Sequence, residues 1–480
     1  MSDISVALSP RTEIQQAFDL QNQHKFVTAR STASQRIAKL KRLHDAMLRY
    51  REDIKAAVWQ DFRKNATETD ISELGVVNTE IRQAIRNLRS WMAHRQVDTP
   101  LPLIGSSSEI RYEPKGVCLI LSPWNFPFNL TFSPLVLAIA AGNCVVVKPS
   151  EYAPASSALM KKMLAECFPP EEVAVFEGDA MMAQELLLLP FNHIFFTGSP
   201  AIGKVVMGAA AKHLASVTLE LGGKNPVIVD ETANLDICAS KLVWTRMMNA
   251  GQSCISPDYV LVHENVQDAL VQKIGEKIRQ FFGDTAEAQR NSPDYCRLIS
   301  DRHFGRVTSL IHEAVQRGAR VAHGGESDAA TRYVQPTVLT HIPEDATIWN
   351  EEVFGPVLSV RSYKTLQEAI AYIGTKPTPL ASYMFSGRNR DVKYFLNETR
   401  SGGVTVNDCE IHFFNTELPF GGMNNSGIGK THGKFGFLEF SNARGVCYQN
   451  RFFPGTNLFH PPYRRSRLAN LIVEAVVKWF

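Results

Sequence analysis

The chain has 480 residues, which is too long for one ordinary hydrophobic core, so we expect two or three domains. Its composition, 44% hydrophobic and 21% charged, is that of a globular protein, and its net charge of +3 excludes nucleic acid as a bulk electrostatic partner. Eight cysteines without a CxxC pair predict neither a disulfide framework nor a metal site, and thiols that stay reduced favour the cytoplasm. The start of the chain lacks a signal-peptide pattern, and we expect no bilayer-spanning segment because no apolar stretch reaches roughly 18–20 residues.

The first hundred residues predict helices. Apolar residues recur at steps of three and four over 33–62 and again over 70–96, with charged residues between them. Prolines and a glycine then interrupt the pattern over 100–108. The alternation that begins at Glu109 predicts an edge or bridging strand over 109–114. Residues 1–25 yield no prediction.

From Gly116 onward, short apolar runs alternate with helical segments. The predicted strands are 117–121, 145–147, 173–176 and 194–196, and the predicted helices are 133–141, 155–166 and 180–188. This alternation predicts an α/β fold with a Rossmann-like parallel sheet covered by helices on both faces. Because such sheets bind ligands beyond the carboxyl ends of their strands, the residues that follow these strands are candidates for cofactor binding.

Three of these strand ends carry unusual residues. Ser122-Pro-Trp-Asn-Phe-Pro127 follows the first strand, Lys148-Pro-Ser-Glu151 the second, and Thr197-Gly-Ser-Pro-Ala-Ile-Gly203 the fourth. The last segment opens a helix near Pro200, where unpaired amides favour a phosphate, although its glycines are equally explained by close helix–strand packing. Lys148 and Glu151 either bracket a ribose or form a solvated surface pair.

A candidate nucleophile lies in Asn249-Ala-Gly-Gln-Ser-Cys254. Most cysteines are small buried hydrophobes, but Cys254 lies in a loop of small residues, where backbone amides can favour a thiolate and provide an oxyanion hole. Glu220, in Leu219-Glu220-Leu-Gly-Gly-Lys224, is a lone carboxyl in an apolar run. Burial there would raise its pKa and suit it to act as a base.

Together these segments resemble the aldehyde dehydrogenases, and the resemblance covers about residues 30–450. Seven motifs occur in the order that this family shows, which is far more specific than any one of them alone. They are Pro123-Trp-Asn-Phe-Pro127, Lys148-Pro-Ser-Glu151, Phe196-Thr-Gly-Ser-Pro-Ala-Ile-Gly203, Glu220-Leu-Gly-Gly-Lys224, Gly251-Gln-Ser-Cys254, Glu352-Val-Phe-Gly-Pro356 and Pro419-Phe-Gly-Gly422.

The resemblance implies a role for each matching position. Cys254 is expected to be the nucleophile, Glu220 the base that activates the deacylating water, and Asn125 the donor that holds the oxyanion together with the Cys254 amide. The implied cofactor is NAD, with NADP as an alternative that a carboxylate at Glu151 disfavours. The implied cofactor contacts are Lys148 and Glu151 at the ribose, Gly198, Ser199 and Gly203 at the pyrophosphate turn, Glu352 at the nicotinamide-side ribose, Phe354 beside that ring, and Trp124, which is assigned to no particular part of the cofactor.

The implied reaction is the oxidation of an aldehyde to the carboxylic acid. The thiolate adds to the carbonyl, the thiohemiacetal transfers hydride to the nicotinamide, and water hydrolyses the resulting thioester. The implied organisation is a cofactor domain over 1–99 and 116–221 and an α/β catalytic domain over 222–422. A small bridging β element over 100–115 and 437–450 and a C-terminal helix over 460–480 complete it.

Within the family, the closest resemblance is to the class-3, coniferyl and fatty aldehyde dehydrogenases. It rests on the short N-terminus, on Cys254-Ile-Ser-Pro-Asp-Tyr259, on Val406-Asn-Asp408 with Ile411-His412, and on Pro461-Pro-Tyr463. It implies a homodimer and a medium-chain, long-chain or aromatic aldehyde, with the loop Cys409-Glu-Ile-His-Phe-Phe414 lining the substrate tunnel.

The last residues predict an amphipathic helix that follows a basic segment over 464–467. Apolar residues recur at steps of three and four from Leu468 to Phe480, in a stretch too short to span a membrane. Two interpretations stay open: docking on the protein's own dimer, or peripheral contact with a membrane that supplies lipid aldehydes.

Two other functions also stay open. An acylating dehydrogenase would pass the thioester to coenzyme A, but a hydrolytic base such as Glu220 is unnecessary for that transfer. A silent structural protein on the same scaffold would have no need of Cys254, Glu220 and Asn125 together.

Overall fold

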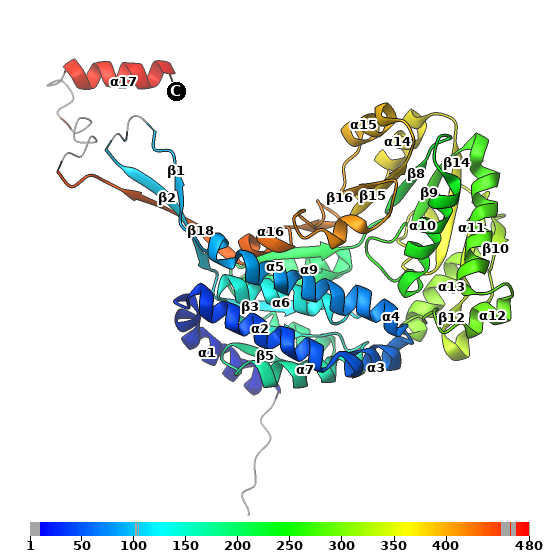
Figure 1. Ribbon diagram of the computed structural model, residues 1–480, viewed down its shortest axis with the longest axis horizontal. Helices are drawn as coiled ribbons and strands as arrows, with labels where there is room; N and C mark the ends of the chain where they lie inside the picture. Colours follow the sequence, from blue (N-terminus) through cyan, green and yellow to red (C-terminus); the bar gives the residue numbers. More distant parts are fainter. Residues whose placement is uncertain (1–9, 101–102, 104, 453–460, 462–466, 480) are drawn as a thin grey trace, which may run out of the picture.

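The computed structural model describes residues 10–100, 103, 105–452, 461 and 467–479. Figure 1 shows two lobes, one from the first half of the chain and one from the second, and a narrow sheet that projects from the first lobe. This arrangement confirms the predicted α/β fold with a parallel cofactor sheet, an α/β catalytic domain and a small bridging β element.

The first lobe contains a six-stranded sheet of order β17-β7-β6-β3-β4-β5, parallel except for β17. Its strands are β3 (Val117–Leu121), β4 (Cys144–Lys148), β5 (Val173–Val175), β6 (His193–Gly198), β7 (Ser216–Leu221) and β17 (Gly427–Ile428). The chain runs outward from β3 to β5 and then returns to the other side of β3. The crevice between the ends of β3 and β6 is therefore the position where such sheets bind ligands.

Each face of this sheet is buried under helices. Side chains alternate along β3, so that Val117 and Leu119 face one core while Cys118 and Ile120 face the other. The helices are α1 (Pro10–Ala29), α2 (Ala33–Arg49), α3 (Arg51–Phe62), α4 (Ala66–Thr69), η1 (Asp70–Gly75), α5 (Val76–Trp91), α6 (Asn129–Ala141), α7 (Pro154–Cys167), α8 (Ala180–Leu186) and α9 (Pro200–Ala211). The predicted helical segment 33–62 is divided at Tyr50 into α2 and α3.

The second lobe contains a seven-stranded sheet of order β10-β13-β14-β9-β8-β15-β16, parallel except for β10. Its strands are β8 (Pro226–Val229), β9 (Tyr259–His263), β10 (Arg320–His323), β13 (Thr337–Thr340), β14 (Val357–Tyr363), β15 (Ala381–Phe385) and β16 (Gly403–Val406), with the small pair β11 (Ser327–Asp328) and β12 (Tyr333–Val334) beside them. The helical elements are α10 (Leu235–Met247), η3 (Met248–Gly251), η4 (Glu264–Val266), α11 (Gln267–Phe282), α12 (Ala286–Asn291), α13 (Asp301–Gln316), η5 (Ala329–Thr331), η6 (Thr347–Trp349), α14 (Leu366–Gly374), α15 (Asn389–Glu398) and η7 (Ile411–Phe414).

The projecting sheet consists of β1 (Arg95–Val97), β2 (Ser107–Pro114) and β18 (Ser441–Tyr448), all antiparallel. The prediction of a helix through residue 96 is wrong at its end, because α5 stops at Trp91 and Arg95–Val97 pairs with β2 instead. The predicted bridging strand over 437–450 is wrong at its start. Residues up to Glu439 belong to α16 (Gly433–Glu439), where Gly436 lets the helix pack directly on Leu137.

The C-terminal helix α17 (Arg467–Trp479) is present and lies apart from both lobes in Figure 1. Leu471 is 62% exposed and Val477 is 76% exposed. Residues 460, 462–466 and 480 of the predicted terminal segment lie outside the described residues. Within the described ranges, every helix is too short or too polar to cross a lipid bilayer.

Candidate active site

Cys254 lies in a backbone segment that L-amino acids rarely adopt. Asn249, Ala250 and Gly251 have consecutive positive φ angles of 54°, 50° and 72°. Left-handed conformations of non-glycine residues cost roughly 1–3 kcal/mol each and persist only where surrounding contacts impose them. The sequence therefore forms this loop only because the rest of the structure holds it.

Buried amide side chains supply those contacts. The Gln252 side chain donates to the carbonyl oxygens of Asn249 and Arg297 at 2.9 and 3.1 Å, and accepts from the Ile299 amide at 3.0 Å. Asn225 donates to the Cys254 carbonyl oxygen at 2.8 Å. These buried hydrogen bonds fix the backbone on both sides of the thiol, so Cys254 starts from a defined position.

Asn125 connects the end of β3 to the cysteine loop. Its side-chain Nδ2 donates to the Gln252 carbonyl oxygen at 3.0 Å, and its own carbonyl oxygen accepts from Asn249 Nδ2 at 2.7 Å. The residue is 3% exposed and lines the same cavity as Cys254. An amide nitrogen has two hydrogens, so this geometry leaves one for an oxyanion.

Glu220 lies on β7, buried and without a hydrogen-bond partner on either carboxyl oxygen among the described residues. Burial raises its pKa well above the usual value; nearby Glu439 raises it further, while Lys430 opposes the shift. Lys430 directs its amine to the Gly421 and Gly422 carbonyl oxygens rather than to this carboxyl. An unpaired buried carboxyl facing a cavity is suited to proton transfer.

Glycines of the family motifs let these groups come together. A Cβ at Gly421 would lie 2.8 Å from Glu220 Oε1, and a Cβ at Gly222 would collide with the Glu352 carboxyl. A Cβ at Gly251 would collide with the Gly355 carbonyl oxygen. Motifs far apart in the sequence therefore meet here, and glycine is required at each close approach.

A cavity of about 230 Å³ opens on one side of Cys254. It is lined by Pro123, Trp124, Asn125, Thr197, Gly198, Ser199, Glu220, Gly222, Cys254, His303, Arg306, Glu352 and Phe354. It lies at the crevice between β3 and β6 and beside the N-terminus of α9, where unpaired backbone amides attract phosphate. The cavity thus combines the three predicted chemical residues with five of the eight predicted cofactor contacts.

The other three predicted cofactor residues lie outside the lining of this cavity. Lys148 Nζ is paired with Glu151 Oε2 at 2.7 Å at the end of β4, and Glu151 is exposed. Gly203 packs α9 on β7, because a Cβ there would lie 2.8 Å from the Leu221 side chain. For Gly203, the structure thus provides a packing reason that is independent of any ligand.

A second cavity, of about 30 Å³, reaches Cys254 from its other side. Its walls are mostly apolar and include Phe126, Leu130, Met248, Phe413 and Phe414. The loop 409–414, predicted to line the substrate tunnel, contributes Glu410 and both phenylalanines to this cavity. Cys254 therefore lies between two cavities. We call the first the polar cavity, after the polar side chains in its wall, and the second the aromatic cavity, after its three phenylalanines. Those polar side chains are Asn125, Thr197, Ser199, Glu220, His303, Arg306 and Glu352.

The Cys254 thiol is less acidic than we expected from its loop of small residues, whose backbone amides were predicted to favour a thiolate. Burial raises the pKa of Cys254, and the carboxyls of Glu352, Glu220 and Glu410 raise it further. Glu352 is in turn shifted, because burial and the charge of Asp258 raise its pKa to about 8. The backbone amides of the loop do not outweigh burial among these acidic groups.

Comparison with known proteins assigns the chain to a family. The model described as "Aldehyde dehydrogenase family" matches residues 4–446. The chain belongs to the aldehyde dehydrogenase family.

Individual relatives agree with this assignment. The chain is 41% identical over 426 residues to the 4,4'-diaponeurosporen-aldehyde dehydrogenase of Staphylococcus aureus, covering 88% of this chain and 91% of that protein. It is 42% identical over 418 residues to aldehyde dehydrogenase family 3 member B1 of Homo sapiens, covering 87% and 88%. The structure titled "Substrate bound state of Staphylococcus Aureus AldH" matches with a TM-score of 0.92 and 38% identity, over 97% of this chain and 99% of that one. The predicted class-3 resemblance is confirmed, and the activity is NAD(P)-dependent aldehyde oxidation.

Sequence reasoning missed the ion cluster that anchors the active-site motifs of this enzyme. Lys224 and Arg246 both pair with buried Asp258, and Lys224 also donates to the carbonyl oxygens of Ile348 and Glu351 at 2.8 Å. Asp258 accepts from the Val353 amide at 3.0 Å. Lys224 and Asp258 stand in the quoted motifs, but one sequence cannot reveal that they meet.

Two residues of α13 were also missed. His303 lies against Trp124 with ring centroids 4.8 Å apart, and burial with two nearby arginines lowers its pKa to about 4. Arg306 donates to the Glu352 and Val353 carbonyl oxygens at 3.0 and 2.6 Å. Both line the polar cavity of the enzyme, yet α13 has no motif that sets them apart from an ordinary amphipathic helix.

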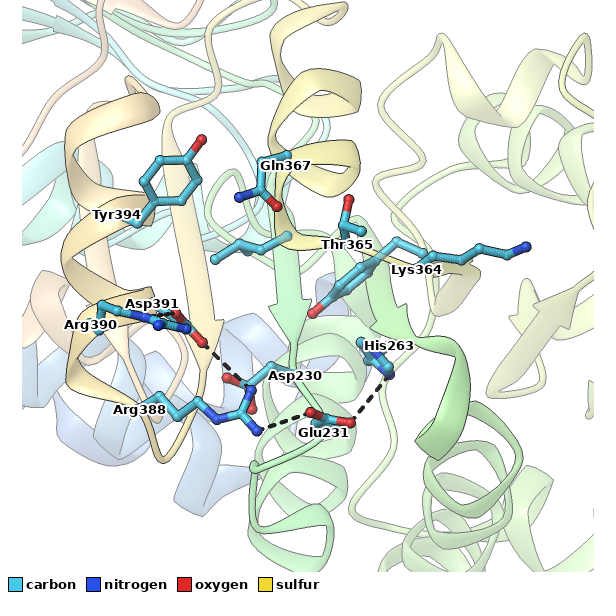
Figure 2. A pocket seen from close by; sticks show the side chains of 12 residues that line it. Asp230, Glu231, His263, Lys364, Thr365, Gln367, Arg388, Arg390, Asp391 and Tyr394 are labelled. Carbon is cyan, nitrogen blue, oxygen red and sulfur yellow. Dashed lines mark hydrogen bonds and ion pairs between the residues drawn. The ribbon is translucent and has the colours of Figure 1, made fainter.

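A further cavity, of about 450 Å³, lies at the carboxyl ends of β8, β9, β14 and β15 and shares no lining residue with the two at Cys254. Figure 2 shows Arg388 between Glu231 and Asp391, at 3.0 and 3.8 Å, with His263 on the far side of Glu231. Cys254 precedes β9, so it lies at the opposite edge of this sheet. Because this cavity is separated from Cys254 in this way, we place no step of the reaction in it.

Proposed function

We propose that the enzyme oxidises apolar aldehydes to free carboxylic acids, with Cys254 as nucleophile, Glu220 as base and Asn125 as oxyanion donor. The observation that carries this proposal is the shared cavity: all three side chains line it, and Cys254 also opens onto the aromatic cavity. An aldehyde in the aromatic cavity would meet the thiol with its carbonyl directed toward Asn125 Nδ2.

The residues then act in two stages. The Cys254 thiol first gives its proton to solvent. Its sulfur then bonds to the carbonyl carbon as the C=O π electrons move to the oxygen, and the remaining Asn125 N–H with the Cys254 amide stabilises the negative oxygen. Oxidation leaves a thioester on the sulfur. Glu220 accepts a proton from water, the resulting hydroxide attacks the thioester carbon, and the C–S bond breaks to release the acid and the thiolate.

The polar cavity fits NAD(P), which supplies a hydride acceptor when bound. The α9 N-terminus offers amides for its phosphates through the segment around Gly198 and Ser199, and Lys148 with Glu151 offers donors and acceptors for a ribose. Glu352 is proposed to contact the second ribose, with Trp124 and Phe354 providing apolar surfaces. Gly203 is proposed to act here only by setting the position of α9.

Product analysis tests this function against transfer to coenzyme A. With hexanal and NAD but no coenzyme A, we expect hexanoic acid and NADH in equal amounts, because a base beside the thioester activates water. NADH formation that depends on added coenzyme A would instead identify an acylating enzyme. Absence of turnover with hexanal and with benzaldehyde, under either cofactor, would favour a silent scaffold.

We further propose that the enzyme prefers NAD over NADP because of Glu151. A carboxylate beside the ribose site repels a 2′-phosphate, although an exposed side chain can move aside. Glu151→Gln is expected to raise kcat/KM with NADP by about tenfold while changing kcat/KM with NAD much less. Steady-state kinetics with both cofactors measure this. The control is Glu177→Gln, a partly exposed glutamate just after β5 in the same lobe, which should leave the ratio of the two kcat/KM values unchanged. Equal kcat/KM values for the two cofactors in the unmodified enzyme would refute the preference.

We also propose a homodimer and peripheral membrane contact through the C-terminal segment. The narrow sheet of β1, β2 and β18 projects from the first lobe with most of β18 exposed, and a sheet of this size is stabilised when another element packs against it. The exposed Leu471 and Val477 of α17 give that helix apolar groups to bury.

Deletion of residues 464–480 tests the role of the helix. We expect loss of binding to liposomes that contain anionic lipid and a higher KM for long-chain aldehydes, with an unchanged KM for hexanal. Liposome sedimentation and kinetics across chain lengths measure these effects, and analytical ultracentrifugation follows the oligomeric state. Unchanged liposome binding and long-chain KM would refute membrane contact, and loss of the dimer would show that the helix docks on the enzyme itself.

A further inference from the structure

Glu410 is a buried carboxyl in the aromatic cavity that the proposed reaction does not use. It precedes η7, is 2% exposed and lines the same cavity as Cys254, where it contributes the single carboxyl group. Its φ angle of 63° is in the left-handed region, which a non-glycine residue adopts only where neighbouring contacts impose it. The fold therefore accepts both backbone strain and a polar group on an otherwise apolar wall.

The carboxyl of Glu410 is not needed to hold its loop. In the described part of the chain it forms no ion pair, and its one side-chain partner is Ser253, whose hydroxyl donates to Oε1 at a long 3.4 Å. The loop is held by other contacts, including Thr405 Oγ1 with His412 Nδ1 at 2.9 Å and the Cys409 amide with Asp408 at 2.8 Å. A purely structural role leaves the position of this carboxyl unexplained.

The groups around Glu410 keep it neutral near pH 7. Burial raises its pKa to about 8; Ser253 and Arg246 oppose the shift, and Glu68 adds to it. The other titratable groups that interact with it are Cys254, Tyr383 and Cys409, and burial raises the pKa of each. A neutral carboxyl has one O–H, so it can donate a hydrogen bond that a carboxylate cannot.

We propose that Glu410 is a specificity-determining residue that donates a hydrogen bond to an oxygen atom of the substrate near the reacting carbonyl. Glu410 contacts Ser253, the residue next to the nucleophile, so it can reach only the first few atoms of the chain beyond the aldehyde carbon. A hydrocarbon there leaves the buried O–H unpaired, whereas an ether or hydroxyl oxygen satisfies it. The preferred substrates are thus aldehydes with an oxygen near the carbonyl and an apolar remainder. This inference rests on the proposed function of Cys254.

A matched substrate pair tests it. Butoxyacetaldehyde has the shape of heptanal with one CH₂ replaced by an ether oxygen, which can only accept a hydrogen bond. The ratio of kcat/KM for the two aldehydes is measured in the unmodified enzyme, in Glu410→Leu and in Glu410→Gln. The intrinsic reactivities of the aldehydes differ, but that difference is common to all three proteins and cancels when their ratios are compared.

We expect Glu410→Leu to lower the ratio of kcat/KM for butoxyacetaldehyde to that for heptanal by about tenfold, because one buried hydrogen bond is lost. Most of this change should come from a higher kcat/KM for heptanal. Glu410→Gln should retain most of the ratio because its amide still donates. From pH 7 to pH 9.5 the ratio should fall in the unmodified enzyme as the carboxyl ionises, and stay constant in Glu410→Gln. If Glu410→Leu leaves this kcat/KM ratio unchanged, the inference is wrong, while the proposed function is unaffected. Failure of the unmodified enzyme to oxidise either aldehyde would instead overturn the proposed function.

Discussion

Replacing Cys254 with alanine is expected to reduce NADH formation from hexanal by about 10⁴–10⁶-fold. The thiol is the one nucleophilic side chain that lines both the polar and the aromatic cavity, so its loss removes the covalent route. Hydride transfer from an aldehyde without that route lacks the tetrahedral intermediate that Asn125 is proposed to stabilise. Absorbance at the NADH band with saturating aldehyde measures the effect.

A matched cysteine separates chemistry from folding. Cys238→Ala also removes a buried thiol, but Cys238 lies in α10 and lines neither cavity at the nucleophile. We expect this variant to retain activity within a few-fold, and both variants to bind NAD as the unmodified enzyme does. More than a few per cent of activity in Cys254→Ala would contradict the role of Cys254 as nucleophile.

Replacing Glu220 with glutamine is expected to leave one rapid burst of NADH and to slow steady-state turnover by about 10²–10⁴-fold. The variant can still form the thioester on Cys254, but no base is left to activate water. Stopped-flow absorbance separates the burst from the steady state, and mass spectrometry detects the acyl adduct on Cys254. Loss of the burst together with the steady state would contradict a role restricted to hydrolysis.

The pH dependence of stability provides an independent check on Glu220. Because burial raises its pKa in the folded state, its contribution to stability is fully present below the unfolded pKa and is lost as pH rises through the folded pKa. Glu220→Gln lacks this loss, so above pH 5 its free energy of unfolding should exceed that of the unmodified enzyme by a margin that grows as the pH rises towards the folded pKa of Glu220. Urea unfolding across pH measures the difference. A margin that shrinks with rising pH would show that the carboxyl is paired in solution.

Much of the fold could be predicted from the sequence because its signals are local. The apolar run of β3 and the three-and-four spacing of α2 each require only a few neighbouring residues, and both elements form where expected. Arg95–Val97 and α16 could not be predicted in this way. The first is a strand only because β2 lies beside it, and the second packs through glycines that weaken a helix in isolation.

The same contrast between local signals and tertiary contacts applies to the residues of the candidate site. Cys254 and Glu220 could be singled out because a thiol among small residues and a carboxyl in an apolar run are unusual in any sequence. Sequence could not reveal that His303 lies against Trp124, nor that Asp258 joins Lys224 to Arg246, since those residues come from separate elements. The cytoplasmic location, the cofactor preference and the dimer stay predictions.

Local patterns and the fixed order of the motifs were sufficient to establish the α/β fold, the family and the residues with reactive groups. The electrostatic state of those groups depends instead on how the chain folds around them. Burial among Glu352, Glu220 and Glu410 makes Cys254 less acidic, and it leaves Glu410 neutral on an apolar wall. These pKa shifts arise because groups from β7, the cysteine loop and the start of η7 lie close together in the folded protein, where water is excluded. The order of residues along the chain does not reveal which groups are brought together in this way.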